Sequence, residues 1–172
     1  MHSYVSGPSE VPLLGETVGR CLDRIASAYP DRDALVCCHQ GLRFTYRTLR
    51  QAIARIARGL LALGVERGDR VALCSPNCAE WMIAQYAAAT AGAILVNINP
   101  AYQRRELEHA LRLSGTSVLV TARRFRSSDY AAMLATLLPA IVTAPRRSPL
   151  SDELPSLRAI VYLGRDPNPG GL

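Results

Sequence analysis

The chain has 172 residues, of which 49% are apolar and 20% charged, and its formal net charge is +6. This length and composition are typical of one globular domain with a sizeable apolar core. All 20 basic residues are arginines spread along the sequence, and aromatic residues make up 6%. A nucleic-acid-binding protein would group its basic residues with aromatic ones, so the composition argues against that class.

The five cysteines give no disulfide framework, because their number is odd and the sequence shows no secretory signal. Residues 1–15 carry neither the basic stretch nor the apolar stretch of a signal peptide, and we expect them to form a flexible leader. Both observations favour a cytoplasmic location with reduced thiols.

An uncharged stretch of 23 residues, 81–103, is long enough to cross a bilayer. Asn97, Asn99 and Pro100 interrupt it, and the strand pattern of residues 93–98 ends the helix that precedes them. We therefore expect a buried helix followed by a buried strand, and no transmembrane segment.

Strands and helices alternate along most of the chain. The spacing of the apolar residues predicts, in chain order, helix 17–29, a hairpin of strands 34–38 and 42–45, helix 46–63, strand 70–74, helix 77–91, strand 93–98, helix 103–113, strand 116–121, helix 127–138 and strand 157–163. This order indicates an α/β fold: a partial doubly wound, mainly parallel sheet with helices on both faces, plus an N-terminal β-hairpin.

Helix 46–63 has the clearest pattern, because its apolar residues recur at intervals of three and four. Thr45 is placed to cap its first turn, and Gly64 is placed to end it in the left-handed conformation. The apolar stripe consists of Tyr46, Leu49, Ile53, Ile56, Leu60 and Leu63.

Three later helices also carry candidate residues for their first turns. Asn77 and Glu80 stand three residues apart, as in a capping box. Glu106 is placed to stabilise the first turn of its helix through the helix dipole. Ser127 or Ser128 is placed to cap the helix that runs to residue 138.

The familiar catalytic and phosphate-binding motifs are missing. The sequence has no G-x-G-x-x-G, no Walker A loop, whose lysine does not exist here, and no G-x-S-x-G. Cys74 and Cys78 lack a second cysteine pair at zinc-finger spacing, so we interpret them as small buried residues. Glu106 and Glu108 point to different faces of their helix and do not form an acid/base pair.

The stretch TAGAILVNINPAYQRRELEHAL, residues 90–111, holds the strongest candidates for ligand contact. Asn97, Asn99 and Tyr102 follow a strand, and ligands of open α/β sheets bind beyond the carboxyl ends of the strands. Asn-Pro is also common turn chemistry, and Pro100 fixes the entry to the next helix. A structural corner is the favoured interpretation, and ligand contact is the alternative.

Several segments, in order and at matching spacing, resemble the AMP-forming acyl-CoA synthetases, and most closely the fatty-acid–CoA ligases of this adenylate-forming superfamily. The segments are FTYRTL, GVERGDRVAL, SPNCAEW, GAILVNINPAY, ELEHALRLSG and FRSSDYAAML. The resemblance covers about residues 16–135 and the segment LPSLRAIVYLG. Thr48 departs from it, because the family usually has an acidic residue there.

The resemblance implies a two-step reaction in which a fatty acid and ATP give an acyl-adenylate and pyrophosphate, and the thiol of CoA then displaces AMP. The family performs it with a Ser/Thr/Gly-rich loop ending in Pro-Lys-Gly, an acidic residue on the ribose and a lysine on a C-terminal lid. None of these matches a position of this sequence, so we assign no catalytic, cofactor-binding or metal-binding residue. ATP, Mg and CoA are expected only for a full-length enzyme.

We accordingly expect four parts: a flexible leader (1–15), an incomplete AMP-binding N-terminal domain (16–138), a proline-rich loop (139–156), and a last strand with a truncated tail (157–172). The chain is expected to be a truncated fatty-acid–CoA ligase that is inactive alone. The alternative is a non-catalytic interaction module that pairs with a partner chain or with the missing C-terminal half. A small, unrelated α/β binding domain is a third reading that the ordered motifs disfavour.

Overall fold

The computed structural model describes residues 7, 10, 13–138 and 150–164. Most of the expected leader, the greater part of the proline-rich loop and the expected tail therefore lie outside the described residues. None of the helices within the described ranges is long and apolar enough to cross a membrane.

A four-stranded parallel sheet forms the centre of the molecule. Its strands are β3 (Arg70–Cys74), β4 (Ile94–Asn97), β5 (Val118–Ala122) and β8 (Ala159–Leu163), in the spatial order β4-β3-β5-β8. All three pairings are parallel. The predicted fold class and these four strands are confirmed.

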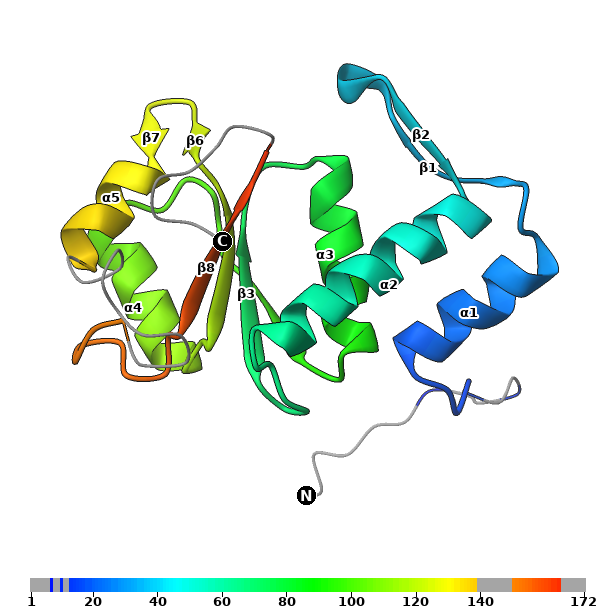
Figure 1. The fold of residues 1–172 in the computed structure, drawn as a ribbon, viewed down its shortest axis with the longest axis horizontal. Coiled ribbons are helices and arrows are strands. Elements are labelled where there is room, and N and C mark those ends of the chain that lie inside the picture. Colours follow the sequence, from blue (N-terminus) through cyan, green and yellow to red (C-terminus); the bar gives the residue numbers. More distant parts are fainter. Residues whose placement is uncertain (1–6, 8–9, 11–12, 139–149, 165–172) are drawn as a thin grey trace.

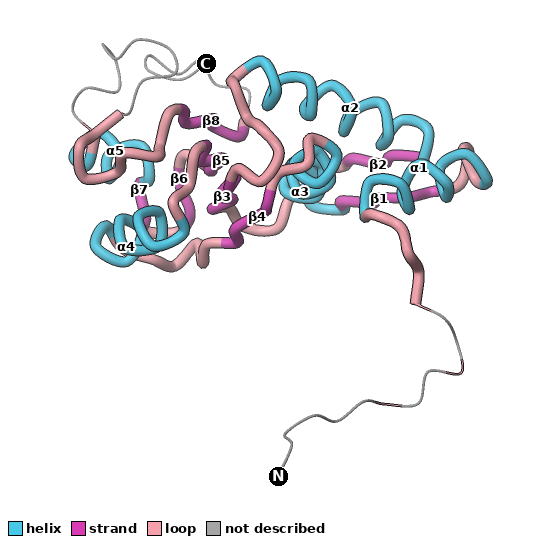
Figure 2. The backbone as a smooth tube through the Cα atoms, turned by 90° about the horizontal axis from the view of Figure 1, so that it is seen from below, coloured by secondary structure: helices cyan, strands magenta, loops and turns pink. Residues whose placement is uncertain are grey.

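Helices cover both faces of the sheet (Figure 1). On one side lie α2 (Tyr46–Ala62) and α3 (Ala79–Thr90), with α1 (Val18–Ala28) packed beyond them. On the other side lie α4 (Arg104–Ser114) and α5 (Tyr130–Leu137). Figure 2 shows the strands from below, between α4 and α5 on one side and α3 on the other.

The sheet lies between two apolar cores, because successive side chains of each strand point to opposite faces of the sheet. Val71 and Leu73 of β3 belong to the core under α2 and α3, whereas Ala72 and Cys74 belong to the core under α4 and α5. All four side chains are almost completely buried. The apolar run of β3 after Arg70 is what a sheet covered on both faces requires.

The predicted N-terminal hairpin is present. Strand β1 (Asp33–Cys37) pairs antiparallel with β2 (Leu42–Thr45), and a 3-10 turn, Cys38–Gln40, joins them. Gly41 closes the turn with a φ of 64°, a conformation that favours glycine. In Figure 1 the hairpin extends away from the main sheet, beyond the start of α2.

Helix α2 begins and ends as its sequence predicts. The Thr45 hydroxyl accepts a hydrogen bond from the Thr48 backbone N–H, and Gly64 follows the helix with a φ of 85°. The Val65 N–H then donates to the Leu60 carbonyl at 3.1 Å, which closes the C-terminal turn.

The predicted capping pair of α3 is wrong. The cap position belongs to Cys78, whose side chain makes no capping hydrogen bond. The Gln40 side chain caps the helix instead: its Oε1 accepts from the Ala79 N–H at 2.7 Å and its Nε2 donates to Glu80 Oε2 at 2.8 Å. A residue 39 positions earlier replaces the local cap because the hairpin turn lies against the start of α3.

The predicted start of the last helix is also wrong. Residues 124–129 form a small hairpin, β6 (Arg124–Phe125) and β7 (Ser128–Asp129), turned by Arg126 with a φ of 52°. Ser128 is buried in β7, and the cap is Asp129, whose carboxylate accepts from the Ala132 N–H at 3.0 Å. The Asp129 carboxylate is a stronger hydrogen-bond acceptor than a serine hydroxyl. Because the small hairpin occupies residues 124–129, the helix begins three residues later than predicted.

Helix α4 is held at both ends. The Glu106 carboxylate accepts from the Gln103 N–H at 2.8 Å, in agreement with its predicted role in the first turn. At the other end, the Arg70 guanidinium donates to the Ser114 carbonyl at 3.0 Å and to the Gly115 carbonyl at 2.8 Å. The first residue of β3 thus satisfies carbonyl groups that the helix leaves unpaired.

Candidate functional site

The order of the strands marks one edge of the sheet as the place for a ligand. After β3 the chain passes to β4 through α3 on one face, and after β4 and β5 it continues into α4 and α5 on the other face. The loops at the carboxyl end of β3 therefore separate from those of its neighbours. In open α/β sheets such a divergence is where ligands bind.

A cavity of about 390 Å³ opens at this edge. Its walls come from the loop after β3, the loop after β4 and the first strand of the small hairpin after β5. They carry no charged side chain; they consist of Ser75, Pro76, Asn77, Trp81, Asn97, Ile98, Asn99, Pro100 and Phe125. The structure thus brings the predicted Asn97 and Asn99 together with Asn77 and Trp81, which the sequence did not connect with them.

The Asn-Pro turn itself serves the scaffold. Asn99 Oδ1 accepts from the Ala101 N–H at 2.9 Å, and the Tyr102 N–H donates to the Asn99 carbonyl at 3.1 Å. The Tyr130 hydroxyl donates to the Pro100 carbonyl and so fixes the turn to the start of α5. This arrangement supports the structural interpretation of the stretch, with the exposed Asn97 amide left facing the cavity.

Cys74 and Tyr130 belong to the same apolar core as Ile98 of the cavity wall, and they are poorly suited to act as nucleophiles. Burial raises the pKa of the Cys74 thiol to about 11. The pKa of the buried Tyr130 phenol rises to about 12, first because of burial and then because of Cys74 beside it. Both groups stay protonated near neutral pH, and a thiol in this state is inert.

The second cysteine of the Cys74–Cys78 pair behaves similarly. Cys78 is half-buried, and desolvation is the main cause of its raised pKa. All five cysteines are free thiols. Within the described ranges, no three His, Cys, Asp or Glu side chains lie close enough together to hold a metal ion.

The two glutamates of α4 have separate roles. Glu106 accepts from the Gln103 backbone, whereas Glu108 lies 3.8 Å from the Arg112 guanidinium one turn later. The structure does not bring them together as an acid/base pair, as expected from their spacing. His39 lies far from them in the first hairpin, where its Nδ1 is 3.5 Å from Cys37 Sγ.

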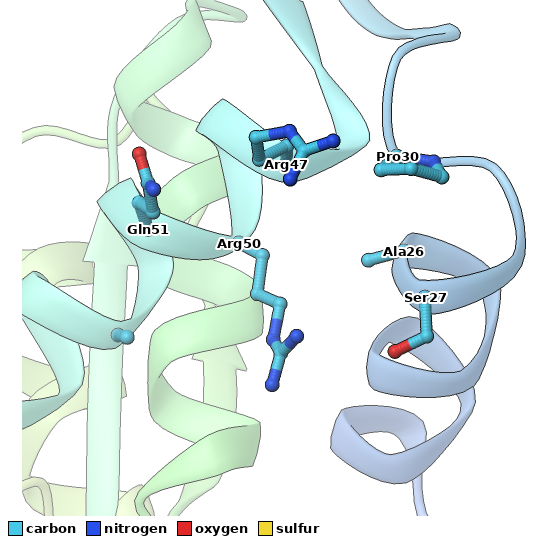
Figure 3. A pocket seen from close by; sticks show the side chains of 7 residues that line it. Ala26, Ser27, Pro30, Arg47, Arg50 and Gln51 are labelled. Carbon is cyan, nitrogen blue, oxygen red and sulfur yellow. The ribbon is translucent and has the colours of Figure 1, made fainter.

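A larger cavity, of about 490 Å³, lies between α1 and α2 (Figure 3). Two arginines of α2 point into it, but each already has a carboxylate partner: Arg47 lies 3.0 Å from Asp31, and Arg50 lies 2.7 Å from Asp23. The opposing charges cancel, so the cavity offers an anion no net attraction. The two ion pairs are better explained as links that hold α1 and the following loop against α2.

Comparison with known proteins identifies the family. The model of a family described as AMP-binding enzyme matches residues 22–168, which is most of the chain. The chain belongs to the AMP-binding enzyme family. The ordered segments that resemble acyl-CoA synthetases lie within this match, and the resemblance is confirmed.

Curated members of the family are similar over nearly the whole chain. The mitochondrial medium-chain acyl-CoA ligase ACSF2 of Rattus norvegicus is 38% identical over 170 residues, which are 99% of this chain and 28% of the rat protein. The corresponding protein of Danio rerio is 42% identical over 159 residues, which are 92% of this chain and 26% of that protein. The chain therefore spans a little over a quarter of the length of these relatives.

Solved structures of the family share the fold. The N-terminal domain of FACL13 from Mycobacterium tuberculosis superposes with a TM-score of 0.68 and 28% identity, over 86% of this chain and 34% of that one. The anthranilate CoA ligase AuaEII, at 24% identity, superposes with a TM-score of 0.75 over 95% of this chain and 28% of the other, which shows the fold alone. The α/β architecture is thus that of the N-terminal part of an AMP-binding enzyme.

Proposed function

We propose that this chain is the N-terminal scaffold of a fatty-acid–CoA ligase and that it has no ligase activity by itself. The observation that carries the proposal is the coverage: 99% of the chain corresponds to 28% of a medium-chain acyl-CoA ligase. The proposed parts are the leader 1–15, the incomplete AMP-binding domain 16–138, the proline-rich loop 139–156 and the last strand with its tail 157–172.

The chemistry of the reaction supports inactivity of the isolated chain. Attack of a carboxylate on the α-phosphate of ATP builds negative charge that needs preorganised donors and a metal ion. The family uses two lysines and an acidic residue for these steps, and this sequence contains no lysine. ATP, Mg and CoA accordingly belong to the full-length enzyme, with the fatty acid as its substrate.

The residues at the carboxyl edge fit a supporting role. The Asn-Pro turn is fixed to α5 through Tyr130, and Gln40 fixes the loop before α3 to the first hairpin. Such contacts hold loops in place around a site whose reacting groups come from elsewhere in the enzyme. They are the contribution that we propose for this part of the chain.

The test is ATP–pyrophosphate exchange with the purified chain and fatty acids of several lengths, beside the full-length rat relative as a positive control. We expect exchange from the relative and a buffer rate from the chain. Exchange by the chain that requires a fatty acid and grows with protein concentration would disprove the proposal.

The alternative function is a non-catalytic interaction module that pairs with a partner chain. A mostly apolar cavity lies beside β8, which is an edge strand among the described residues, and this favours the alternative because such edges promote association. Affinity capture from native lysate tests this alternative. A capture that recovers no stoichiometric partner counts against it.

A further inference from the structure

The densest group of arginines in the sequence lies just before Ser127. Arg123, Arg124 and Arg126 stand close together, whereas the remaining arginines stand singly or in pairs. The Ser127 hydroxyl therefore has arginines one, three and four residues before it. Many serine kinases select their substrates by an arginine three residues before the serine, which acidic side chains of the kinase bind. The sequence around Ser127 has the charge pattern of such a substrate.

Ser27 and Ser127 are the two serine or threonine residues of the sequence that have an arginine three residues before them. The structure distinguishes them. Ser27 lies in the last turn of α1, where its hydroxyl donates to the Asp23 carbonyl at 2.8 Å. Arg24, three residues before it, is paired with Glu16. A kinase binds its substrate in an extended conformation, so the helix withholds Ser27.

Ser127 lies in the turn of the small hairpin instead. The two strands, β6 and β7, pair through only two residues each, and their turn stands at the outer edge of the molecule (Figure 1). The Ser127 side chain is exposed and forms no hydrogen bond with another of the described residues. A hairpin this short opens at little cost. The segment around Ser127 is therefore available to a kinase in extended form.

Ser128 shows how closely the site is defined. It follows Ser127 directly, but it is buried, and its hydroxyl accepts from Gln103 Nε2 at 3.4 Å. The residue three positions before it is Phe125 and not an arginine. Both the charge pattern and the exposure therefore favour Ser127 over its neighbour.

The same arginines suit a phosphate once it is attached. Arg124 lies 2.7 Å from Asp129, whereas Arg126 has no carboxylate partner among the described residues. The Arg126 guanidinium lies over the Phe125 ring, 5.2 Å from its centroid. Its φ of 52° is uncommon for a residue with a side chain, and such strain is often found at functional sites. A phosphate on Ser127 would meet a guanidinium that no carboxylate neutralises.

We propose that Ser127 is a phosphorylation site and that Arg126 binds its phosphate. The kinase transfers the γ-phosphoryl group of ATP: the bond from Ser127 Oγ to phosphorus forms, the bond from phosphorus to the ADP oxygen breaks, and the serine proton passes to the catalytic base of the kinase. Phe125, two residues away, lines the cavity at the carboxyl edge, whose walls carry no charge. Phosphorylation thus places about two negative charges near an uncharged cavity. The proposal does not depend on the proposed ligase function.

The test compares the three serines in one reaction. The purified chain is incubated with Mg-ATP and the catalytic domain of a serine kinase that selects arginine three residues before the serine. Peptide mass spectrometry follows phosphate at Ser27, Ser127 and Ser128 with time. Synthetic peptides of residues 21–31 and 121–131 show what the kinase does without the fold. We expect it to accept both peptides, and in the folded chain to modify Ser127 at least about tenfold faster than the other two serines.

Two variants test the role of charge. Arg124→Gln should slow modification of Ser127 by about tenfold, because the kinase loses a charge-assisted hydrogen bond. Arg58→Gln removes an exposed arginine of α2 and should change the rate by less than about twofold. Phosphorus-31 NMR titration reports on Arg126: the phosphoserine should have a pKa below its usual value of about 6, and Arg126→Gln should restore that value.

Equal rates at Ser27 and Ser127 in the folded chain overturn the proposal, and so does a kinase that modifies the 121–131 peptide but not the chain. A phosphoserine pKa that Arg126→Gln leaves unchanged overturns the role of Arg126. Protein isolated from its native cells with phosphatase inhibitors must also carry phosphate at Ser127. Its absence at every stage of growth overturns the assignment of Ser127 as a phosphorylation site.

Discussion

Gln40 is the residue whose replacement tests the structure most sharply. Its side chain joins the first hairpin to α3 through two hydrogen bonds: it accepts from the Ala79 N–H at 2.7 Å and donates to Glu80 Oε2 at 2.8 Å. Within the hairpin it also accepts from Cys37 Sγ at 2.8 Å. Gln40→Ala removes all three and leaves the first turn of α3 without a side-chain cap.

The loss of stability caused by Gln40→Ala can be estimated from the hydrogen bonds that it removes. Removing a helix cap costs about 1 kcal/mol. A hydrogen bond to a charged group contributes about 1.5–3 kcal/mol when it is buried, and less here because the site is half-exposed. We expect Gln40→Ala to lower the free energy of unfolding by about 1–2 kcal/mol, since water can replace some of the hydrogen bonds that the Gln40 side chain makes.

Urea unfolding followed by the fluorescence of Trp81, the single tryptophan of the chain, measures this change. Gln51→Ala is the control, because Gln51 is an exposed amide on α2 and its replacement should change stability by less than about 0.5 kcal/mol. Gln40→Glu should be destabilising at neutral pH and less so near pH 4, since two facing carboxylates repel when both are ionised. Equal urea midpoints for Gln40→Ala and Gln51→Ala would show that the Gln40 side chain does not stabilise the start of α3.

Three further predictions concern single side chains. Thr48→Glu should raise the free energy of unfolding by about 0.5–1 kcal/mol in urea unfolding, because a glutamate at this position completes a capping box with Thr45; an unchanged midpoint would contradict it. Asp129 has a lowered pKa, mainly because it accepts from the Ala132 N–H, so its contribution to stability is present above its usual pKa of 3.8 and is lost as the pH falls. Asp129→Asn should therefore weaken the loss of stability in acid, as measured by unfolding at a series of pH values, and an identical acid profile would contradict this. Near pH 7 a maleimide should modify the exposed Cys38 and not Cys74, whose reaction should rise only toward its pKa of about 11; rapid neutral labelling of Cys74 in folded protein would show the assignment wrong.

The fold was largely predictable because its signals are local. The stripe of α2, its cap at Thr45 and the apolar runs of β3 and β5 depend on neighbouring residues, and the structure confirms each of them. The scaffold role of the Asn-Pro turn also followed from local chemistry, which the hydrogen bond of Asn99 to Ala101 supports.

The incorrect predictions have two causes: contacts between residues far apart in the sequence, and elements too short to show a periodic pattern. The sequence pointed to Asn77 and Glu80 as a local cap, whereas the cap comes from Gln40, and no periodicity reports a partner 39 residues away. The start of α5 was misplaced because a hairpin of two-residue strands gives no alternation to read. The exposure of Ile56 was equally invisible, because the stripe predicts which face is apolar and not what covers it.

The cytoplasmic location stays a prediction. The name of the rat relative gives a mitochondrial location, but this is a property of that protein and does not locate this chain. The absence of assigned catalytic residues likewise stays a prediction until the isolated chain is assayed.

The size of the native product shows whether this chain is part of a longer ligase. An immunoblot of native lysate with antibodies against residues 16–135 reports it. Because the chain of 18.7 kDa corresponds to 28% of the rat relative, we expect a band at about 67 kDa. A single band at 18.7 kDa would contradict it and would favour the interaction module.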